Sequence, residues 1–113
     1  MNLIEGRVEG GAFIAESCRI PDLAVRDGPV TLGFRAEDAD IVDGEAAGHI
    51  AAPIYTLEML GDATMVSIRI AGALVSAKAP KTYRARIGDP VAIRVPHEHV
   101  HLFDAGTGER LDG

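Results

Sequence analysis

The segment ATMVSIRIAGALVSAKA (residues 63–79) decides the fold class of this chain. In its first half, the alternate positions Val66, Ile68 and Ile70 are aliphatic, while the intervening Ser67 is polar. This period of two is typical of a strand with one buried face, because successive side chains of a β-strand point to opposite sides. We therefore expect a strand here, with its aliphatic face in the core and Ser67 directed outward.

A turn and a second strand follow directly. Gly72 is the turn signal, and the run that starts at Leu74 places Ser76 and Lys78 on its solvent side. Two alternating runs joined by a glycine turn predict an antiparallel hairpin. The pattern recurs along the chain, and we expect seven or eight short strands in all. They are the first residues up to the break at Gly10-Gly11, then residues 12–20, 29–35, 48–60, 63–71, 74–79, 90–95 and 100–103.

The longest of these segments, residues 48–60, changes its apolar parity near Pro53. Ile50 and Ile54 share one parity before the change, and Leu57 takes the other after it. A change of parity at a proline predicts a β-bulge or a bend, because an extra residue in one strand moves all later side chains to the opposite face.

The sequence predicts an all-β fold. No segment has a convincing helical period, and the acidic residues 36–48 are expected to form a loop with one helical turn at most. Residues 80–86 and the tail from residue 104 onward are expected to be loops as well. Short strands at close spacing predict a closed or partly open barrel, because closure removes exposed sheet edges.

Size and composition indicate one small domain over residues 1–113. The chain is 47% hydrophobic with a mean hydropathy of +0.12, which is enough for a packed core. Aromatic residues make up only 4% and there is no tryptophan. The core must therefore consist mainly of Val, Ile, Leu and Ala.

Charge and cysteine usage exclude several classes of protein. The net charge is −6, and the basic residues are scattered, with no run longer than a spaced pair such as Arg84 and Arg86. We expect no nucleic-acid partner, because phosphate binding needs clustered basic residues. The single Cys18 is expected in the core. Glu5 and Glu9 are incompatible with a signal peptide, and no apolar run approaches the roughly 20 residues of a membrane span, so we expect a cytoplasmic domain.

The chain lacks the residue patterns of known catalytic machinery. A phosphate-binding loop needs a Gly-Lys-Ser/Thr sequence. The two lysines are Lys78 and Lys81, and Lys81 follows Pro80 instead of a glycine. The serines have no nucleophile-elbow motif around them. We therefore expect no enzymatic activity and no cofactor in this chain.

His97, His99 and His101 form a candidate metal cluster. Residues i, i+2 and i+4 of a strand share a face, so three imidazoles could converge on zinc or nickel. Against this, such side chains stand about 7 Å apart along a strand, and Pro96 favours a turn. The carboxylates of residues 37–45 lack the order of a calcium loop and are expected to form a solvated connector.

Three stretches, in the same order, resemble one protein family. VTLGFRAEDADIV (residues 30–42) is similar to the Gly-Ile-Arg-Pro-Glu motif in the ATP-binding subunits of maltose-type ABC importers, which carry sugars or glycerol phosphate. That motif lies in their C-terminal regulatory domain, called TOBE or molybdate-binding-protein-like. YTLEMLGDATMVSIRI (residues 55–70) resembles the family's Val-Glu-x-Leu-Gly-x-Glu-Thr segment, and IGDPVAIRVPHEHVHLFDAGTGERL (residues 87–111) resembles its closing signature. The sequence departs from the family pattern at Ala36, Ala63 and His97.

The resemblance implies an OB-like, Greek-key barrel behind a nucleotide-binding domain, which would hold ATP and magnesium and is absent from this chain. It also implies a regulatory role, contact with the ATPase domain and with a twin subunit in a homodimer, and indirect contact with membrane permease subunits at the inner membrane. A regulatory protein or a small ligand would supply the signal. The positions that match the family motifs are Gly33, Arg35, Glu37, Glu58, Gly61, His101 and Phe103.

Alternatives to this interpretation remain open at the level of sequence. Arg35, Glu37 and Glu58 could stabilise turns locally instead of contacting a partner. The chain could be a stand-alone oxyanion-binding barrel, since Asn2, Ile4 and Gly6 match the second half of the opening motif of the molybdate-binding barrels. The Ser-Ala-Arg donors of that motif are missing, and a negative domain attracts anions poorly. A histidine-dependent metal protein is the third alternative.

Overall fold

The computed structural model describes residues 1–42 and 48–111. Residues 43–47 of the expected acidic loop and the last two residues of the expected tail lie outside the described residues. The described part has eleven strands and two short 3-10 helices. They are β1 (Asn2–Glu9), β2 (Ala12–Ala15), β3 (Cys18–Ile20), β4 (Gly28–Phe34), η1 (Ala36–Asp38), β5 (Asp40–Val42), β6 (Ile50–Pro53), β7 (Thr56–Met59), β8 (Ala63–Ile70), β9 (Ala73–Pro80), β10 (Pro90–Arg94), η3 (His97–His99) and β11 (His101–Asp104).

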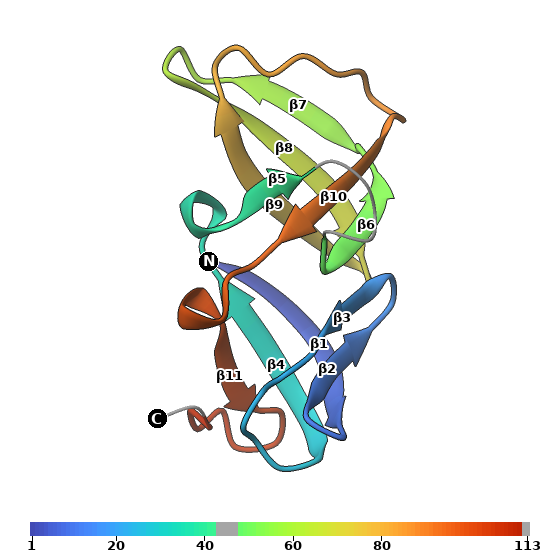
Figure 1. Cartoon of the computed structure of the whole chain (residues 1–113), viewed down its shortest axis with the longest axis vertical. Coiled ribbons are helices and arrows are strands. Elements are labelled where there is room, and N and C mark those ends of the chain that lie inside the picture. The colour runs from blue at the N-terminus through green and yellow to red at the C-terminus, as the bar shows by residue number, and fades with distance from the viewer. Residues whose placement is uncertain (43–47, 112–113) are drawn as a thin grey trace.

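The strands form two antiparallel sheets, which confirms the all-β prediction. One sheet has eight strands in the order β11-β4-β1-β2-β3-β6-β10-β5, and the other has three in the order β7-β8-β9. In Figure 1, β1–β4 and β11 form the lower part of an elongated molecule, and β5–β10 form the upper part. The N-terminus lies at the level where the two parts meet. No helix in residues 1–42 and 48–111 is long and apolar enough to cross a membrane.

A single aliphatic core runs through both parts. The predicted inward faces are confirmed: Val30, Leu32 and Phe34 of β4 are buried, as are Val66 and Ile68 of β8. They belong to one continuous cluster of buried side chains that draws on both sheets. Burial of apolar side chains in one shared core fixes the two sheets against each other.

The prediction that Ser67 points to solvent is wrong, because the outer side of the β8–β9 hairpin is covered at this point. The Asn2 amide donates to the carbonyl oxygen of Ser76 at 2.7 Å and accepts the Ser76 N–H at 2.9 Å. The hydroxyls of Ser67 and Ser76 lie 2.8 Å apart and bond to each other. The start of β1 is therefore clamped to β9 across the two sheets.

The single strand expected over residues 12–20 is divided into β2 and β3. Ala15 pairs with Cys18, so Glu16 and Ser17 form a two-residue hairpin loop. Ser17 has φ +55°, the left-handed conformation that usually selects glycine. The sequence has no glycine or proline at this turn, which is why the alternation conceals it.

Residues 36–48 contain the expected helical turn, η1, but also an unexpected strand, β5. Ile41 of β5 pairs with Ile93 of β10, and Asp40 pairs with Arg94. Three residues are too few for a period of two to stand out among acidic neighbours. The strand forms because β10 offers it a partner that lies about fifty residues later in the sequence.

The parity change expected at Pro53 is confirmed as a break between β6 and β7. The N–H of Tyr55 donates to the Ser67 carbonyl at 2.7 Å, while Thr56 is the register partner of that same Ser67. Two residues of one strand therefore face one residue of the other, which is a β-bulge. It lets the chain leave the large sheet at Pro53 and enter the small one.

Candidate interaction face

Two of the three family-like motifs meet on one face of the large sheet. Strands β4 and β11 pair so that His101 lies opposite Gly33 and Phe103 lies opposite Thr31. Paired residues of an antiparallel ladder point to the same side of a sheet. The side opposite the core therefore collects residues that are about seventy positions apart in the sequence.

The first residues of the chain bring two further apolar side chains to this side, those of Met1, which precedes β1, and of Leu3 in β1. Leu3 pairs with Gly33. The side chains of Met1, Leu3 and Phe103 surround Gly33. A Cβ at Gly33 would lie 2.8 Å from Met1 Sδ and 3.2 Å from Leu3 Cδ2. These side chains lie across the strand where a Cβ would stand, so a larger residue at position 33 would push their ends aside. We call Met1, Leu3, Gly33, His101 and Phe103 the motif face.

The motif face is apolar and open to solvent. Met1 is 64% exposed and Leu3 is 52% exposed, although both are large hydrophobic residues. His101 Nδ1 lies 2.6 Å from a guanidinium nitrogen of Arg110 at the margin. Grouped exposed apolar side chains with polar neighbours are typical of surfaces that contact another protein.

Arg35 and Glu37 follow Gly33 at the end of β4 and are both exposed. Neither side chain forms an ion pair or hydrogen bond with any residue of the described part. The local pairing that was the alternative for these two residues is therefore not formed. Their charges are therefore available to a partner.

The remaining motif positions, Glu58 and Gly61, lie in the other sheet. Gly61 has φ +90° and begins the two-residue loop of the β7–β8 hairpin, closed by the Leu60 N–H to the Ala63 carbonyl at 2.8 Å. This confirms the predicted hairpin turn. Glu58 is exposed in β7 and bonds to no described side chain, so it does not stabilise the turn. These two positions are not part of the motif face.

The three histidines of the candidate metal cluster have three different partners. His97 Nε2 lies 2.8 Å from the Pro21 carbonyl oxygen, and His99 Nδ1 lies 3.7 Å from Asp38 Oδ2. His101 contacts Arg110 on the motif face. Within residues 1–42 and 48–111, no three His, Cys, Asp or Glu side chains are grouped so that they could hold a metal ion.

His49, which no motif or alternation in the sequence marks, lies between the two parts of the molecule. Its N–H donates to the Ile93 carbonyl and its own carbonyl accepts the Arg19 N–H. Its ring is stacked on that of His97, with centroids 6.3 Å apart, and Nδ1 accepts the N–H of Val95 at 3.1 Å. Burial, followed by the positive charges of His97 and Arg94, lowers the pKa of His49 below 6.5.

Cys18 lies in the core, as predicted. Burial raises the pKa of its thiol to about 12, so the thiolate is scarce at neutral pH. Since the thiolate is the reactive form of cysteine, this side chain is chemically inert under ordinary conditions.

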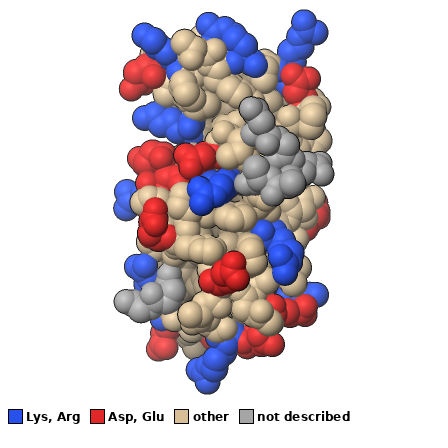
Figure 2. All heavy atoms as spheres, viewed as in Figure 1, with Lys and Arg blue, Asp and Glu red and all other residues tan. Residues whose placement is uncertain are grey.

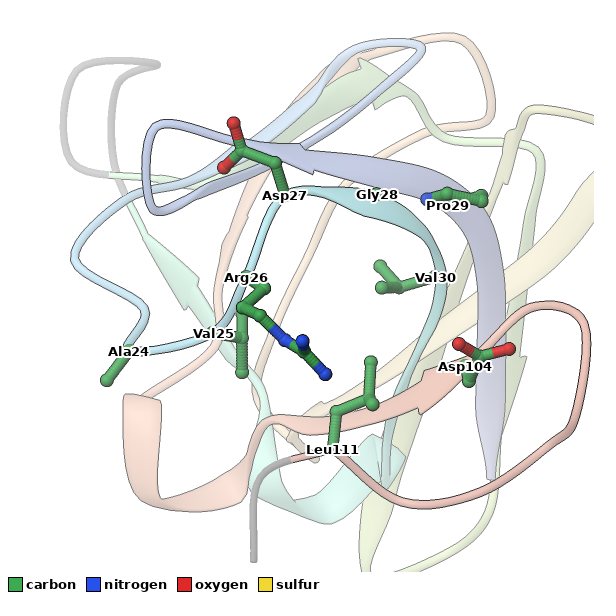
Figure 3. A pocket seen from close by; sticks show the side chains of 9 residues that line it. All are labelled: Ala24, Val25, Arg26, Asp27, Gly28, Pro29, Val30, Asp104 and Leu111. Carbon is green, nitrogen blue, oxygen red and sulfur yellow. The ribbon is translucent and has the colours of Figure 1, made fainter.

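A hollow of about 420 Å³ lies between residues 24–30 and the C-terminal segment near Leu111. Figure 3 shows the side chains of Arg26 and Leu111 pointing into it. Its carboxylates are already engaged: Asp27 accepts the Gly10 N–H, and Asp104 accepts the N–H groups of two residues of its own turn. These bonds lower the pKa of Asp104. The acids of this hollow therefore serve turns and do not form a catalytic pair.

Acidic side chains gather elsewhere, on the side of η1 and β5, as Figure 2 shows. Asp40 lies 3.9 Å from a guanidinium nitrogen of Arg94, and Asp38 lies near His99. The contact between Asp40 and Arg94 is a partly exposed ion pair, which contributes little to stability. The arrangement agrees with the expected solvated acidic segment.

The structure gives the oxyanion alternative little support. Asn2 is the polar residue that matched the opening motif of the molybdate-binding barrels, and both ends of its amide are bonded to the Ser76 backbone. The Asn2 side chain is largely buried and one of its N–H groups and its oxygen are bonded inside the fold, so it is poorly placed to hold an oxyanion.

The sequence already held a signal for the motif face. Leu3 has the same parity as the outward-facing Glu5 and Arg7 of β1. A large apolar residue on the polar parity of a strand is a candidate for a contact surface. The convergence of β1, β4 and β11 could not be predicted, because the pattern within a strand does not say which strands pair.

A family model described as a TOBE domain matches residues 32–103. The sn-glycerol-3-phosphate import ATP-binding protein UgpC 1 of Rhizobium johnstonii is 29% identical over 119 residues, which cover 99% of this chain. UgpC of Jannaschia sp. is 33% identical over 114 residues and 98% of this chain. The xylose/arabinose import ATP-binding protein XacK of Haloferax volcanii is 28% identical over 122 residues and 98% of this chain.

In each of these three relatives, the matched part is 32% of the relative's own length. The chain thus spans about a third of the curated relatives it matches, and it corresponds to their C-terminal part.

Proposed function

Because the chain belongs to the TOBE domain family, we propose that it is the C-terminal regulatory and dimerisation domain of the ATP-binding subunit of a bacterial ABC importer. The solute would be a sugar or a related compound such as a glycerol phosphate, as the names of the relatives suggest. The observation that carries the proposal is the motif face, whose exposed apolar side chains, Met1 and Leu3, are suited to contact with another protein surface.

In this proposal, residues 1–113 are one regulatory barrel, and the chemistry takes place elsewhere. An ATPase domain in the same polypeptide would bind ATP and magnesium. A twin subunit would form the homodimer, and membrane permease subunits would be contacted indirectly. A regulatory protein or a small ligand would supply the signal. The complete protein would lie in the cytoplasm at the inner membrane.

ATP hydrolysis by the complete polypeptide, compared with a version truncated just before residue 1, tests this function. We expect truncation to change the hydrolysis rate, because a regulatory domain acts through its contacts with the ATPase core. The variant Leu74→Ala is the control, since it alters one exposed side chain outside the motif face. If truncated and complete proteins hydrolyse ATP at the same rate under all conditions, the regulatory role is excluded.

A further inference from the structure

We propose that the stacked rings of His49 and His97 form a proton-sensitive latch between the two parts of the molecule. The latch is closed at neutral pH and opens as the pH falls below about 6.5. It is a property of the chain itself, and only its use as the signal of a regulatory domain rests on the proposed function.

His49 lies where the two parts of the molecule meet. Its N–H donates to the Ile93 carbonyl of β10, in the upper part, and its carbonyl accepts the Arg19 N–H of β3, in the lower part. The register of β3 with β6 consists of one pair, Cys18 with Ile50. The seam between these two strands is therefore short, and contacts beside it contribute to holding the two parts together.

The hydrogen bonds of the two rings fix where each ring carries its hydrogen. The Val95 N–H can only donate, so Nδ1 of His49, 3.1 Å away, accepts and carries no hydrogen. The Pro21 carbonyl oxygen can only accept, so Nε2 of His97, 2.8 Å away, donates. The ring centroids are 6.3 Å apart and the planes are within 9° of parallel. The pair thus connects Val95, which follows β10, to Pro21, which follows β3.

A proton affects the two rings differently. His97 gains a proton at Nδ1 and keeps its bond to Pro21, because Nε2 remains a donor. His49 gains a proton at Nδ1 too, but there the new N–H faces the N–H of Val95, which loses its acceptor. Val95 is fully buried, so water does not replace the lost acceptor. Protonation of His49 therefore releases the residue through which β10 continues to η3.

Positive charges around the rings oppose the closed latch in acid. Burial, followed by the positive charges of His97 and Arg94, lowers the pKa of His49. When both rings carry a proton, they repel each other across the stack. The other charged groups on the elements packed around the rings are Arg19 of β3, Asp22 in the segment after β3 and Glu98 of η3. The two carboxylates line a hollow together with His97 and not with His49, so they do not offset the charge that forms on His49.

The released segment leads to the motif face. Helix η3 ends at His99, and β11 begins at His101 of the motif face after one intervening residue. Acidity at the seam therefore acts on the segment that positions β11. In the proposed regulatory domain, this gives protons a route to the surface that is suited to contact.

Hydrogen exchange of backbone amides in this chain tests the latch with a matched pair of sites. The Val95 N–H is held by a ring nitrogen that takes up protons, whereas the Ser76 N–H is held by Asn2 Oδ1, which does not titrate. Between about pH 7.5 and 5.5, the protection factor of Val95 should fall about tenfold or more, while that of Ser76 changes little. The Arg19 N–H, whose acceptor is the His49 carbonyl, should follow Val95.

Two substitutions separate the roles of the rings. His49→Asn keeps an acceptor for the Val95 N–H and does not titrate, so the protection of Val95 should become independent of pH. His97→Gln keeps a donor for the Pro21 carbonyl and removes the neighbouring charge. In that variant, Val95 should lose its protection at a higher pH than in the parent, because His49 then accepts a proton more readily.

Four results would overturn the latch. Constant protection of Val95 would show that no proton releases it, and equal losses at Val95 and Ser76 would indicate global destabilisation. A loss at Val95 that Arg19 does not share would mean one weakened bond and no release of the seam. An unchanged midpoint in His97→Gln would remove the second ring from the device. None of these measurements involves ATP hydrolysis, so the latch and the regulatory function succeed or fail separately.

Discussion

Gly6 shows at the level of one residue how closely β1 and β2 approach. A Cβ at Gly6 would lie 2.5 Å from the carbonyl oxygen of Ile14 and 2.7 Å from Phe13 Cζ. Backbone cannot move aside as a flexible side chain can. Gly6→Ala should therefore lower the free energy of unfolding by about 1–3 kcal/mol, measured by urea titration.

Gly106→Ala is the matched control for Gly6→Ala. Its Cβ would meet only Asp104 Oδ1, at 3.3 Å, in an exposed turn. We expect a change within about 0.5 kcal/mol, as is usual for surface substitutions. If Gly6→Ala and Gly106→Ala lose equal amounts of unfolding free energy, the close approach of β2 to position 6 is not the reason for the glycine there.

Thr64 has a hydroxyl that is buried without a hydrogen-bond partner in the described part of the chain. Leaving a buried polar group unsatisfied costs about 1–3 kcal/mol. Thr64→Val keeps the shape and removes the hydroxyl, so thermal or urea unfolding should show a gain of about 1 kcal/mol. Thr64→Ser keeps the hydroxyl and loses the methyl group, and should be less stable than the parent. A destabilised valine variant would mean that the hydroxyl has a role in the fold.

His49 makes the stability depend on pH. Its pKa is below 6.5 in the folded chain, mainly because the ring is buried, and Nδ1 cannot take a proton without losing the Val95 N–H. The unfolded chain therefore binds more protons than the folded chain between that lowered pKa and about 6.5. The contribution of neutral His49 to the free energy of unfolding is fully present above about pH 6.5. It is lost progressively as the pH falls through the pKa that His49 has in the folded chain.

His49→Asn tests this pH dependence, because asparagine keeps an acceptor near the Nδ1 position and does not titrate in this range. We expect the free energy of unfolding of the parent to fall more steeply than that of the variant below pH 6.5. His99 and His101 are common to both proteins and cancel in the difference between the curves, so the difference reports His49 together with its contact to the stacked ring of His97. Two parallel curves would remove His49 as the cause.

At the level of elements, the clamp between β1 and β9 holds the two sheets together. Asn2→Ala removes two hydrogen bonds and leaves the N–H and carbonyl of Ser76 without their partner. The loss in unfolding free energy should be about 2 kcal/mol. Ser76→Ala keeps those backbone groups and loses only the bond to the Ser67 hydroxyl, so it should cost less. If the serine variant costs as much as the asparagine variant, the clamp is not the dominant contact.

The alternation of side chains predicts long strands well and short ones poorly. It identifies β8 and β9, since eight residues in each repeat the period several times. It does not separate β2 from β3, because Ser17 takes a left-handed turn conformation without a glycine to mark it. It also misses β5, where three residues form a strand only because β10 lies beside them. Short elements depend on tertiary partners that no local pattern contains.

At the level of the whole molecule, the sequence does not predict that the residues of the motif face lie together. The residues of the first and third motifs are evident in the sequence, but their meeting depends on the pairing of β4 with β11. Glu58 and Gly61 belong to the same set of motifs and yet lie in the other sheet. Order in the sequence therefore identifies the family, and only the topology shows which motif residues share a surface.

Dimerisation of the complete polypeptide tests the central claim most directly. Light scattering over a dilution series would compare it with the version truncated before residue 1. A regulatory and dimerisation domain predicts that truncation weakens the dimer by about tenfold or more in Kd, which is about 1.4 kcal/mol. An identical Kd for the two proteins would contradict the claim.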